Sequence, residues 1–161
     1  MQITRVGIGY DIHRLVSGKL LFLGGVSIDF QKGLEGHSDA DVLIHAICDA
    51  ILGAIGEEDL GSFFPDTDLN NKNRPSCEFL SSVMNIARKK GYSIVNLDCV
   101  VIAEEPKIKS HKKEIIKSLA DIMGIGIDKI NVKGKTKEKL GEVGAGDAIE
   151  TYVVAMVSAM Q

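Results

Sequence analysis

The segment that most constrains the fold is Ala148–Ala159, with the sequence AIETYVVAMVSA. It is apolar and rich in β-branched residues, a composition that predicts a long β-strand. Two further apolar stretches, Ile3–Tyr10 and Tyr92–Ala103, predict strands for the same reason. A sheet built from such strands must bury at least one face, so the rest of the chain has to supply a covering layer.

Helical patterns alternate with these strands. They have apolar residues three or four positions apart and are bounded by Pro or Gly. The expected helices are Asp39–Gly53, Pro75–Lys90 and Ser110–Met123, with a single helical turn at Thr136–Leu140. The remaining expected elements are a hairpin across Lys19–Phe30 that turns at Gly24-Gly25, and a strand that begins at Ile130–Val132. The polar stretch 56–73 is long for a connection, which indicates a functional loop.

These elements predict one α/β (α+β) domain over residues 1–161, a mixed β-sheet with helices packed on one face. The 161 residues are 45% hydrophobic and 25% charged, which is enough to form one core. No further segment is left to cover the other face of the sheet. We therefore expect the chain to associate with copies of itself through the sheets.

Composition and charge exclude several classes of function. The net charge is −3 and there is no Trp, so neither a basic field nor stacking residues favour nucleic acid. No apolar run is long enough to cross a membrane. The three cysteines form no CxxC pair, which favours reduced thiols in a cytoplasmic protein over a disulfide framework.

A candidate metal site involves residues distant in the sequence. Asp11 and His13 are two positions apart on an extended chain, so their side chains point the same way. With His45 they would form a ligand set that suits zinc and leaves a fourth position open. Asp41 and Asp49 lie one turn before and after His45, where a carboxylate commonly supports a ligating imidazole. The alternative is a core histidine, with Asp11 only capping a turn.

Two further polar segments precede and follow this helix. His37 and Ser38 would lie beside the N-terminus of the helix, where backbone N–H groups favour an anion. Ser38 or Asp39 would equally serve as a simple N-cap. The polar loop has carboxylates at residues 59, 66 and 68, which are either solvated turn residues or acceptors for polyol hydroxyls.

The segment Lys133–Lys139 ends one strand with a run of cations. Its backbone N–H groups, the Thr136 hydroxyl and the lysines suit a diphosphate. Glu138 is unsuited to phosphate itself, but it suits Mg²⁺ or Mn²⁺ bridging phosphate oxygens. The alternative is a solvated basic turn.

Taken together, these motifs resemble the 2-C-methyl-D-erythritol 2,4-cyclodiphosphate synthase family. The resemblance rests on five segments in order, GYDIH (9–13), HSDADVLIHA (37–46), DLGSFFPDTD (59–68), IAEEPK (102–107) and KTKEKLG (135–141). It covers essentially the whole chain. One departure is Ala40, where the family often has Gly.

The resemblance implies a role for each matching position. The implied zinc ligands are Asp11, His13 and His45, with Glu138 as ligand of magnesium or manganese. The implied catalytic residues are His37, Thr136 and Glu138. The implied substrate-binding residues are Asp11, His13, His37, Ser38, Asp59, Leu60, Gly61, Phe64, Pro65, Asp66, Thr67 and Asp68 around the methylerythritol phosphate, Ala103, Glu104, Glu105, Pro106, Lys107, Ile108 and Lys109 around the cytosine, and Lys135, Thr136, Lys137 and Glu138 around the diphosphate.

The family resemblance also implies an activity and an assembly. The expected reaction converts 4-diphosphocytidyl-2-C-methyl-D-erythritol 2-phosphate to the cyclic diphosphate with release of CMP, a step of isoprenoid precursor synthesis. The expected assembly is a homotrimer with each active site between two subunits. Two alternatives are a zinc phosphohydrolase that uses the same ligands, and a trimeric ligand-binding module without catalysis.

Overall fold

The computed structural model describes residues 3–65, 67–71 and 74–160. The strands are β1 (Thr4–Ser17), β2 (Leu21–Leu23), β3 (Val26–Ile28), β4 (Lys32–Leu34), β5 (Tyr92–Ile102), β6 (Ile130–Lys135) and β7 (Ala148–Ala159). The helices are α1 (Val42–Ala54), α2 (Leu60–Phe63), α3 (Ser76–Lys89), α4 (Ile108–Met123) and α5 (Gly141–Gly144), with 3-10 turns η1 (Leu69–Asn71) and η2 (Ile127–Lys129).

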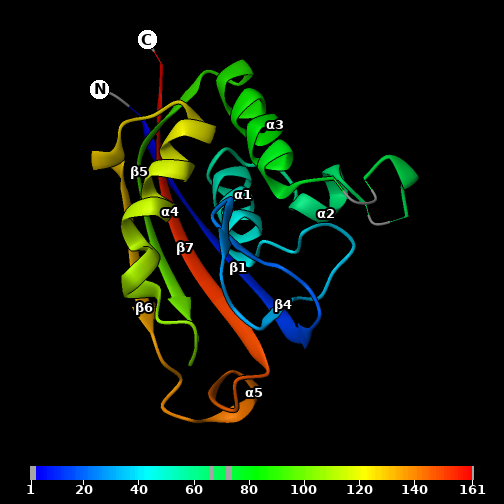
Figure 1. The fold of residues 1–161 in the computed structure, drawn as a ribbon. Coiled ribbons are helices and arrows are strands. Elements are labelled where there is room, and N and C mark those ends of the chain that lie inside the picture. The colour runs from blue at the N-terminus through cyan, green and yellow to red at the C-terminus, as the bar shows by residue number, and fades with distance from the viewer. Residues whose placement is uncertain (1–2, 66, 72–73, 161) are drawn as a thin grey trace.

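The main sheet has the order β4-β1-β7-β5-β6 (Figure 1). The long strand β7 lies at its centre and pairs antiparallel with both β1 and β5, while β6 runs parallel to β5. The hairpin β2-β3 forms a separate pair. This arrangement confirms the predicted mixed sheet.

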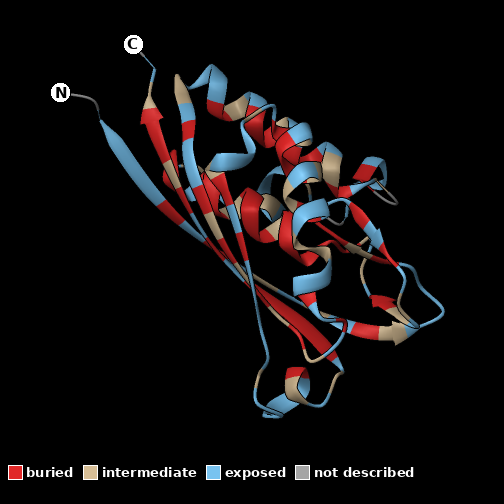
Figure 2. Cartoon of the chain, turned by 60° about the vertical axis from the view of Figure 1, so that its left-hand side comes forward, coloured by how far each residue is buried: buried red, intermediate tan, exposed pale blue. Residues whose placement is uncertain are grey.

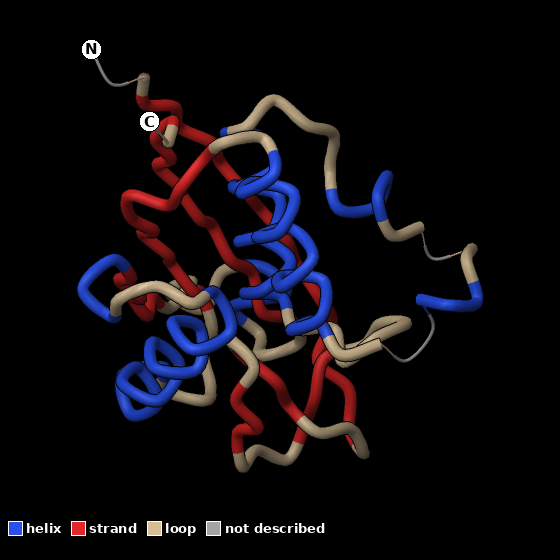
Figure 3. Tube along the Cα trace, turned by 90° about the horizontal axis from the view of Figure 1, so that it is seen from above, coloured by secondary structure: helices blue, strands red, loops and turns tan. Residues whose placement is uncertain are grey.

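The helices α1, α3 and α4 cover one face of this sheet (Figures 1 and 2). Between the two layers lies the core, to which α1 contributes most of its length, including the fully buried Leu43, Ile47 and Ile51. The segment of α2 and η1 extends from the side of this body (Figure 3). Among the described residues, no helix combines the length and the apolarity needed to cross a bilayer.

Two glycines bring α1 unusually close to β1. A Cβ atom at Gly7 would lie 2.0 Å from the carbonyl oxygen of Ala50, and one at Gly9 would lie 1.8 Å from that of Ala46. Only glycine fits at such distances, because the helix backbone rests directly on the strand. Since side chains alternate along a strand, Asp11 and His13 continue the same face toward α1.

The opposite face of the sheet is apolar and exposed. Its side chains include Ile8, 70% exposed, and Val6, 60% exposed, on β1, with Val154, 44% exposed, on β7. Tyr10 and Tyr152 lie beside them with their ring centroids 4.8 Å apart. An uncovered apolar face was expected, and association of copies through it stays a prediction.

The strand β1 continues to Ser17, well beyond the expected end at Tyr10. Local backbone geometry accounts for two further expectations that are wrong. Ala40 has a φ of 54°, so α1 begins only at Val42 and its N-cap is Asp41 instead of Ser38 or Asp39. A φ in this region favours glycine, because a Cβ atom is strained there. Glu138 and Lys139 have φ values of 52° and 61°, which excludes the predicted helical turn at Thr136–Leu140.

Candidate active site

The residues Asp11, His13 and His45 meet between β1 and α1. The Nε2 atom of His13 lies 2.9 Å from Oδ2 of Asp11, and Nδ1 of His45 lies 3.1 Å from the same oxygen. The two imidazole nitrogens are 3.3 Å apart. All three side chains are partly buried, and the predicted convergence of these residues is confirmed.

In each imidazole, the inner nitrogen is the one that faces Asp11, and the outer nitrogen faces away from it. The hydrogen bond of the outer nitrogen determines whether the inner nitrogen carries a hydrogen. Nδ1 of His13 donates to the carbonyl oxygen of Glu35 over 2.8 Å. Nε2 of His45 lies 3.0 Å from the Ser76 hydroxyl, which donates to the carboxylate of Asp39 and therefore accepts from the imidazole. In the neutral rings, both inner nitrogens are thus free of hydrogen and present lone pairs.

This arrangement fits a divalent metal ion. Two nitrogen lone pairs and a carboxylate oxygen repel one another unless a cation or a proton lies between them. A zinc ion about 2.0 Å from each ligand would hold these atoms about 3.3 Å apart, close to the spacing they already have. These three residues would hold the ion and leave a coordination position for a ligand, and all three line one hollow.

Ser76 and Asp39 support His45, and sequence reasoning missed Ser76. The Ser76 side chain is fully buried at the first residue of α3, and its backbone N–H also donates to Asp39 over 3.0 Å. The relay from Asp39 through Ser76 holds the ring of His45 with Nδ1 inward. A serine that starts a helix has no distinctive sequence signal, because capping accounts for it equally well.

We expect Ser76→Ala to weaken metal binding about 10- to 100-fold, because the imidazole of His45 loses the acceptor that orients it. Competition with a fluorescent chelator measures the affinity. Ser81→Ala is the matched control, since Ser81 lies on the same helix and, among the described residues, its hydroxyl donates only to the carbonyl of Cys77. Equal metal affinities in the two variants would contradict the role of Ser76.

In the metal-free protein, the attraction between the Asp11 carboxylate and the neighbouring imidazoles shifts the pKa values of Asp11 and His13. Burial alone would raise the pKa of Asp11, but hydrogen bonds from His13 and His45 outweigh it and lower the pKa to about 2. Burial likewise opposes the charged form of His13, and the hydrogen bond and charge of Asp11 outweigh it, so the pKa of His13 is raised.

The lowered pKa of Asp11 makes stability depend on pH. Above the ordinary value of 3.8 the carboxylate is charged in both states, whereas between 3.8 and about 2 only the unfolded chain takes up the proton. We expect the free energy of unfolding of the chelated protein to fall by about 2 kcal/mol as the pH drops through this window. Denaturant titrations measure it, and Asp11→Asn should remove this component; an unchanged slope would contradict the assignment.

The two carboxylates predicted to support His45 have other partners. Both oxygens of Asp41 are occupied by backbone N–H groups, from Ile44 and Gly24 on one oxygen and from Gly25 on the other. Asp41 therefore caps α1 and anchors the β2-β3 turn, which corrects the prediction. Asp49 accepts from the N–H of Leu60 over 2.7 Å, and burial raises its pKa.

A hollow of about 250 Å³ opens beside the metal-ligand group. The residues predicted to bind substrate that line it are Asp11, His13, His37, Ser38, Leu60, Gly61 and Phe64. It is also lined by Asn71 and Phe79, which sequence reasoning missed because they look like ordinary loop and core residues.

The other residues predicted for this part of the site lie outside the hollow. The Asp59 carboxylate accepts from the N–H and hydroxyl of Ser62 and faces a separate, shallower depression. Asp68 accepts from Asn70, and Pro65 and Thr67 are exposed. Asp66 lies outside the described residues.

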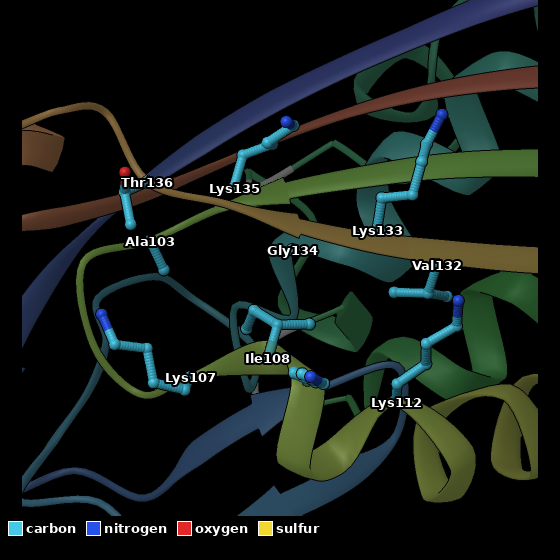
Figure 4. A pocket seen from close by; sticks show the side chains of 10 residues that line it. Ala103, Lys107, Ile108, Lys112, Val132, Lys133, Gly134, Lys135 and Thr136 are labelled. Carbon is cyan, nitrogen blue, oxygen red and sulfur yellow. The ribbon is translucent and has the colours of Figure 1, made fainter.

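A second pocket, of about 450 Å³, lies between β6 and the start of α4 (Figure 4). It is lined by Ala103, Lys107, Ile108, Lys109, Lys112, Val132, Lys133, Gly134, Lys135 and Thr136. The structure thus brings the predicted cytosine segment and the predicted diphosphate segment to one basic pocket. Lys112 was not predicted. Lys133 belongs to the predicted run of cations, and it pairs with Asp98 over 2.7 Å.

Five residues assigned to this region are not among those that line the pocket. The ammonium group of Lys137 pairs with Glu150, and the backbone N–H of Lys137 donates to the carboxylate of Glu104. Direct binding of the diphosphate by the Lys137 side chain is therefore not supported. The carboxylate of Glu104 is likewise engaged, and Glu105 pairs with Lys107 at the surface. Neither these residues nor Pro106 is among those that line the pocket. Glu138 is exposed, and its Oε1 accepts from the Thr136 hydroxyl over 3.1 Å.

The two pockets are separated within one chain. The metal-ligand group lies on β1 and the Lys135–Glu138 turn follows β6, with β7 and β5 between these strands. Three strand spacings correspond to about 14 Å. The described residues therefore present two separate sites, one with a metal-ligand group and one with a basic pocket.

Comparisons with known proteins agree with this architecture. The chain is 50% identical to the 2-C-methyl-D-erythritol 2,4-cyclodiphosphate synthase of Geotalea daltonii over 153 residues, which cover 95% of this chain and 90% of the relative. It is 52% identical to the synthase of Aquifex aeolicus over 134 residues, covering 83% and 86% of the two chains.

Solved structures show the same fold. The CDP complex of IspF from Plasmodium falciparum has a TM-score of 0.87 and 40% identity, covering 98% of this chain and 97% of that one. The bifunctional IspDF of Campylobacter jejuni has a TM-score of 0.96 and 35% identity, and this chain spans 44% of its length. The sequence model of the YgbB family matches residues 4–158. The chain therefore belongs to the YgbB family.

Proposed function

We propose that the chain converts 4-diphosphocytidyl-2-C-methyl-D-erythritol 2-phosphate to 2-C-methyl-D-erythritol 2,4-cyclodiphosphate and CMP. The relatives that match nearly the whole chain carry the name of this synthase. The observation that carries the proposal is the convergence of Asp11, His13 and His45 beside a hollow, in a chain that also has a basic nucleotide-sized pocket.

In this reaction an oxygen of the 2-phosphate forms a bond to the β-phosphorus, and the bond from that phosphorus to the oxygen of CMP breaks. CMP leaves with the electron pair. Phosphate is already nucleophilic at neutral pH, so no dedicated base is needed. The main task of the protein is to hold two anionic groups in line.

The residues of the chain divide this task by position. Ala103 and Lys107–Lys109 hold the cytosine against the floor of the basic pocket. Lys135, Thr136 and the backbone of the following turn bind the diphosphate. His37 and Ser38 bind the methylerythritol phosphate beside the metal-ligand group, and Asp59 and Gly61 bind ribose or polyol hydroxyls.

Two metal sites complete the proposal. Asp11, His13 and His45 hold one zinc ion per chain, and Glu138 holds Mg²⁺ or Mn²⁺ on the diphosphate. When bound, these ions supply positive charge to the phosphate oxygens and to the departing CMP.

We further propose that the chain forms a homotrimer in which each active site lies between two subunits. The apolar face of the sheet provides the contact surface. A contact between two copies that places the metal-ligand group of one beside the basic pocket of the next joins the two sites. Such a heterologous contact closes into a ring when it repeats around a threefold axis.

Product analysis tests the activity. Incubation with the substrate should release CMP and the cyclic diphosphate in equal amounts, identified by mass spectrometry. A zinc phosphohydrolase with the same ligands would instead release inorganic phosphate and would need a metal-bound hydroxide. A non-catalytic binding module would leave the substrate intact. Either of these two results would refute the proposed function.

A further inference from the structure

Glu150 is a buried carboxylate on the face of the sheet that is otherwise apolar. It lies on β7 and is 4% exposed. In the sheet register its neighbours are Ile12 on β1 and Ile102 on β5, so both flanking strands present apolar side chains beside it. A charged group in such surroundings is costly unless it has a partner.

The partner of Glu150 comes from the turn that follows β6. The ammonium group of Lys137 donates to Oε1 of Glu150, and the hydroxyl of Tyr10 donates to Oε2 over 3.3 Å. The bond to Glu150 raises the pKa of Lys137. The side chain of Lys137 is therefore held down on the sheet instead of extending toward a ligand.

A second carboxylate holds the backbone of the same turn. Oε1 of Glu104 accepts from the N–H of Lys137 over 3.0 Å and from the N–H of Lys139 over 3.3 Å. Between these two residues lies Glu138. Glu138 and Lys139 both adopt left-handed φ values, a conformation that is strained for non-glycine residues and needs support from its surroundings.

We propose that Glu104 and Glu150 are positioning residues that hold the Thr136–Glu138 turn in its ligand-binding shape, Glu104 through the backbone and Glu150 through Lys137. This inference rests on the proposed function of the turn in diphosphate binding. Neither carboxylate touches the substrate. They act by fixing where the Thr136 hydroxyl and the Glu138 carboxylate lie, which are already joined to each other by a hydrogen bond.

The test compares CDP with CMP, because only CDP has the β-phosphate that the turn would bind. Calorimetry in the presence of Mg²⁺ should show that the unmodified protein prefers CDP. In Glu150→Gln and in Lys137→Met we expect this preference to fall about ten-fold, while the affinity for CMP stays within about two-fold. Lys117→Met is the matched control, since Lys117 pairs with Asp121 on the exposed side of α4.

The double variant Lys137→Met/Glu150→Gln separates positioning from a simple effect on stability. It removes both charges, so no unpaired charge stays buried, and the free energy of unfolding should recover relative to Lys137→Met. The CDP preference should stay lost, because the turn is still released. A restored preference in the double variant would overturn the inference, as would a full preference in both single variants.

Two other outcomes are equally decisive. If the single variants lose CMP affinity as much as CDP affinity, the substitutions distort the whole pocket and the positioning role is wrong. If the unmodified protein binds neither nucleotide, the proposed function itself fails, and this inference fails with it.

Discussion

His45→Ala is expected to remove the bound metal and to lower turnover at least about a thousand-fold, with the fold retained. His45 provides one of the three ligand atoms, and its loss leaves Asp11 and His13 too few to hold zinc. The fold should persist because other residues of α1, such as Leu43, Ile47 and Ile51, form the core. Metal content per chain, circular dichroism and CMP release measure the three parts of this result.

The matched control for this variant is His111→Ala, on α4, which is not among the residues that line either pocket. It should keep its metal and its activity. A His45→Ala protein that unfolds would support the alternative in which His45 is a histidine of the core. A folded His45→Ala protein with ordinary turnover would contradict the metal site itself.

Glu138→Gln is expected to lower kcat at least about a hundred-fold while zinc stays bound. The amide keeps the size of the side chain and removes the charge that would hold Mg²⁺ or Mn²⁺ on the diphosphate. Glu138 is not one of the three proposed zinc ligands, so the zinc content should not change. Turnover at rising Mg²⁺ concentration measures the effect, and Glu142→Gln on the neighbouring α5 is the control. Full activity would exclude the role of Glu138.

The same two variants test whether active sites lie between subunits. Each variant alone is inactive, but in a mixed trimer some sites combine an intact metal-ligand group from one subunit with an intact turn from another. Random mixing of equal amounts after unfolding and refolding should restore about a quarter of the unmodified activity. Mixed protein without activity would place the complete site within one chain.

Much of the fold could be predicted from the sequence because its strands and helices have clear periodicities. The strand Ala148–Ala159 has the predicted bounds, and the hairpin at Gly24-Gly25 lies where paired glycines indicate it. The spacing of Asp11 and His13 was sufficient to predict that both side chains point to one side. Their meeting with His45 depends on the close approach of α1, which Gly7 and Gly9 permit.

The supporting contacts were harder to predict because they join distant segments. Asp41 looked like a support for His45, but its buried carboxylate is closed off by three N–H groups, two of them from the β2-β3 turn. Lys137 looked like a phosphate ligand within a basic run, yet Glu150 on another strand holds it. Such pairings depend on which strands become neighbours, and the local sequence does not carry that information.

CMP release from 4-diphosphocytidyl-2-C-methyl-D-erythritol 2-phosphate, measured before chelation, after chelation and after zinc and Mg²⁺ are restored, tests the central claim most directly. We predict formation of CMP together with the cyclic diphosphate, its loss on chelation, and its return with the metals. Turnover unaffected by thorough removal of metal, or CMP that appears without the cyclic product, would contradict the account.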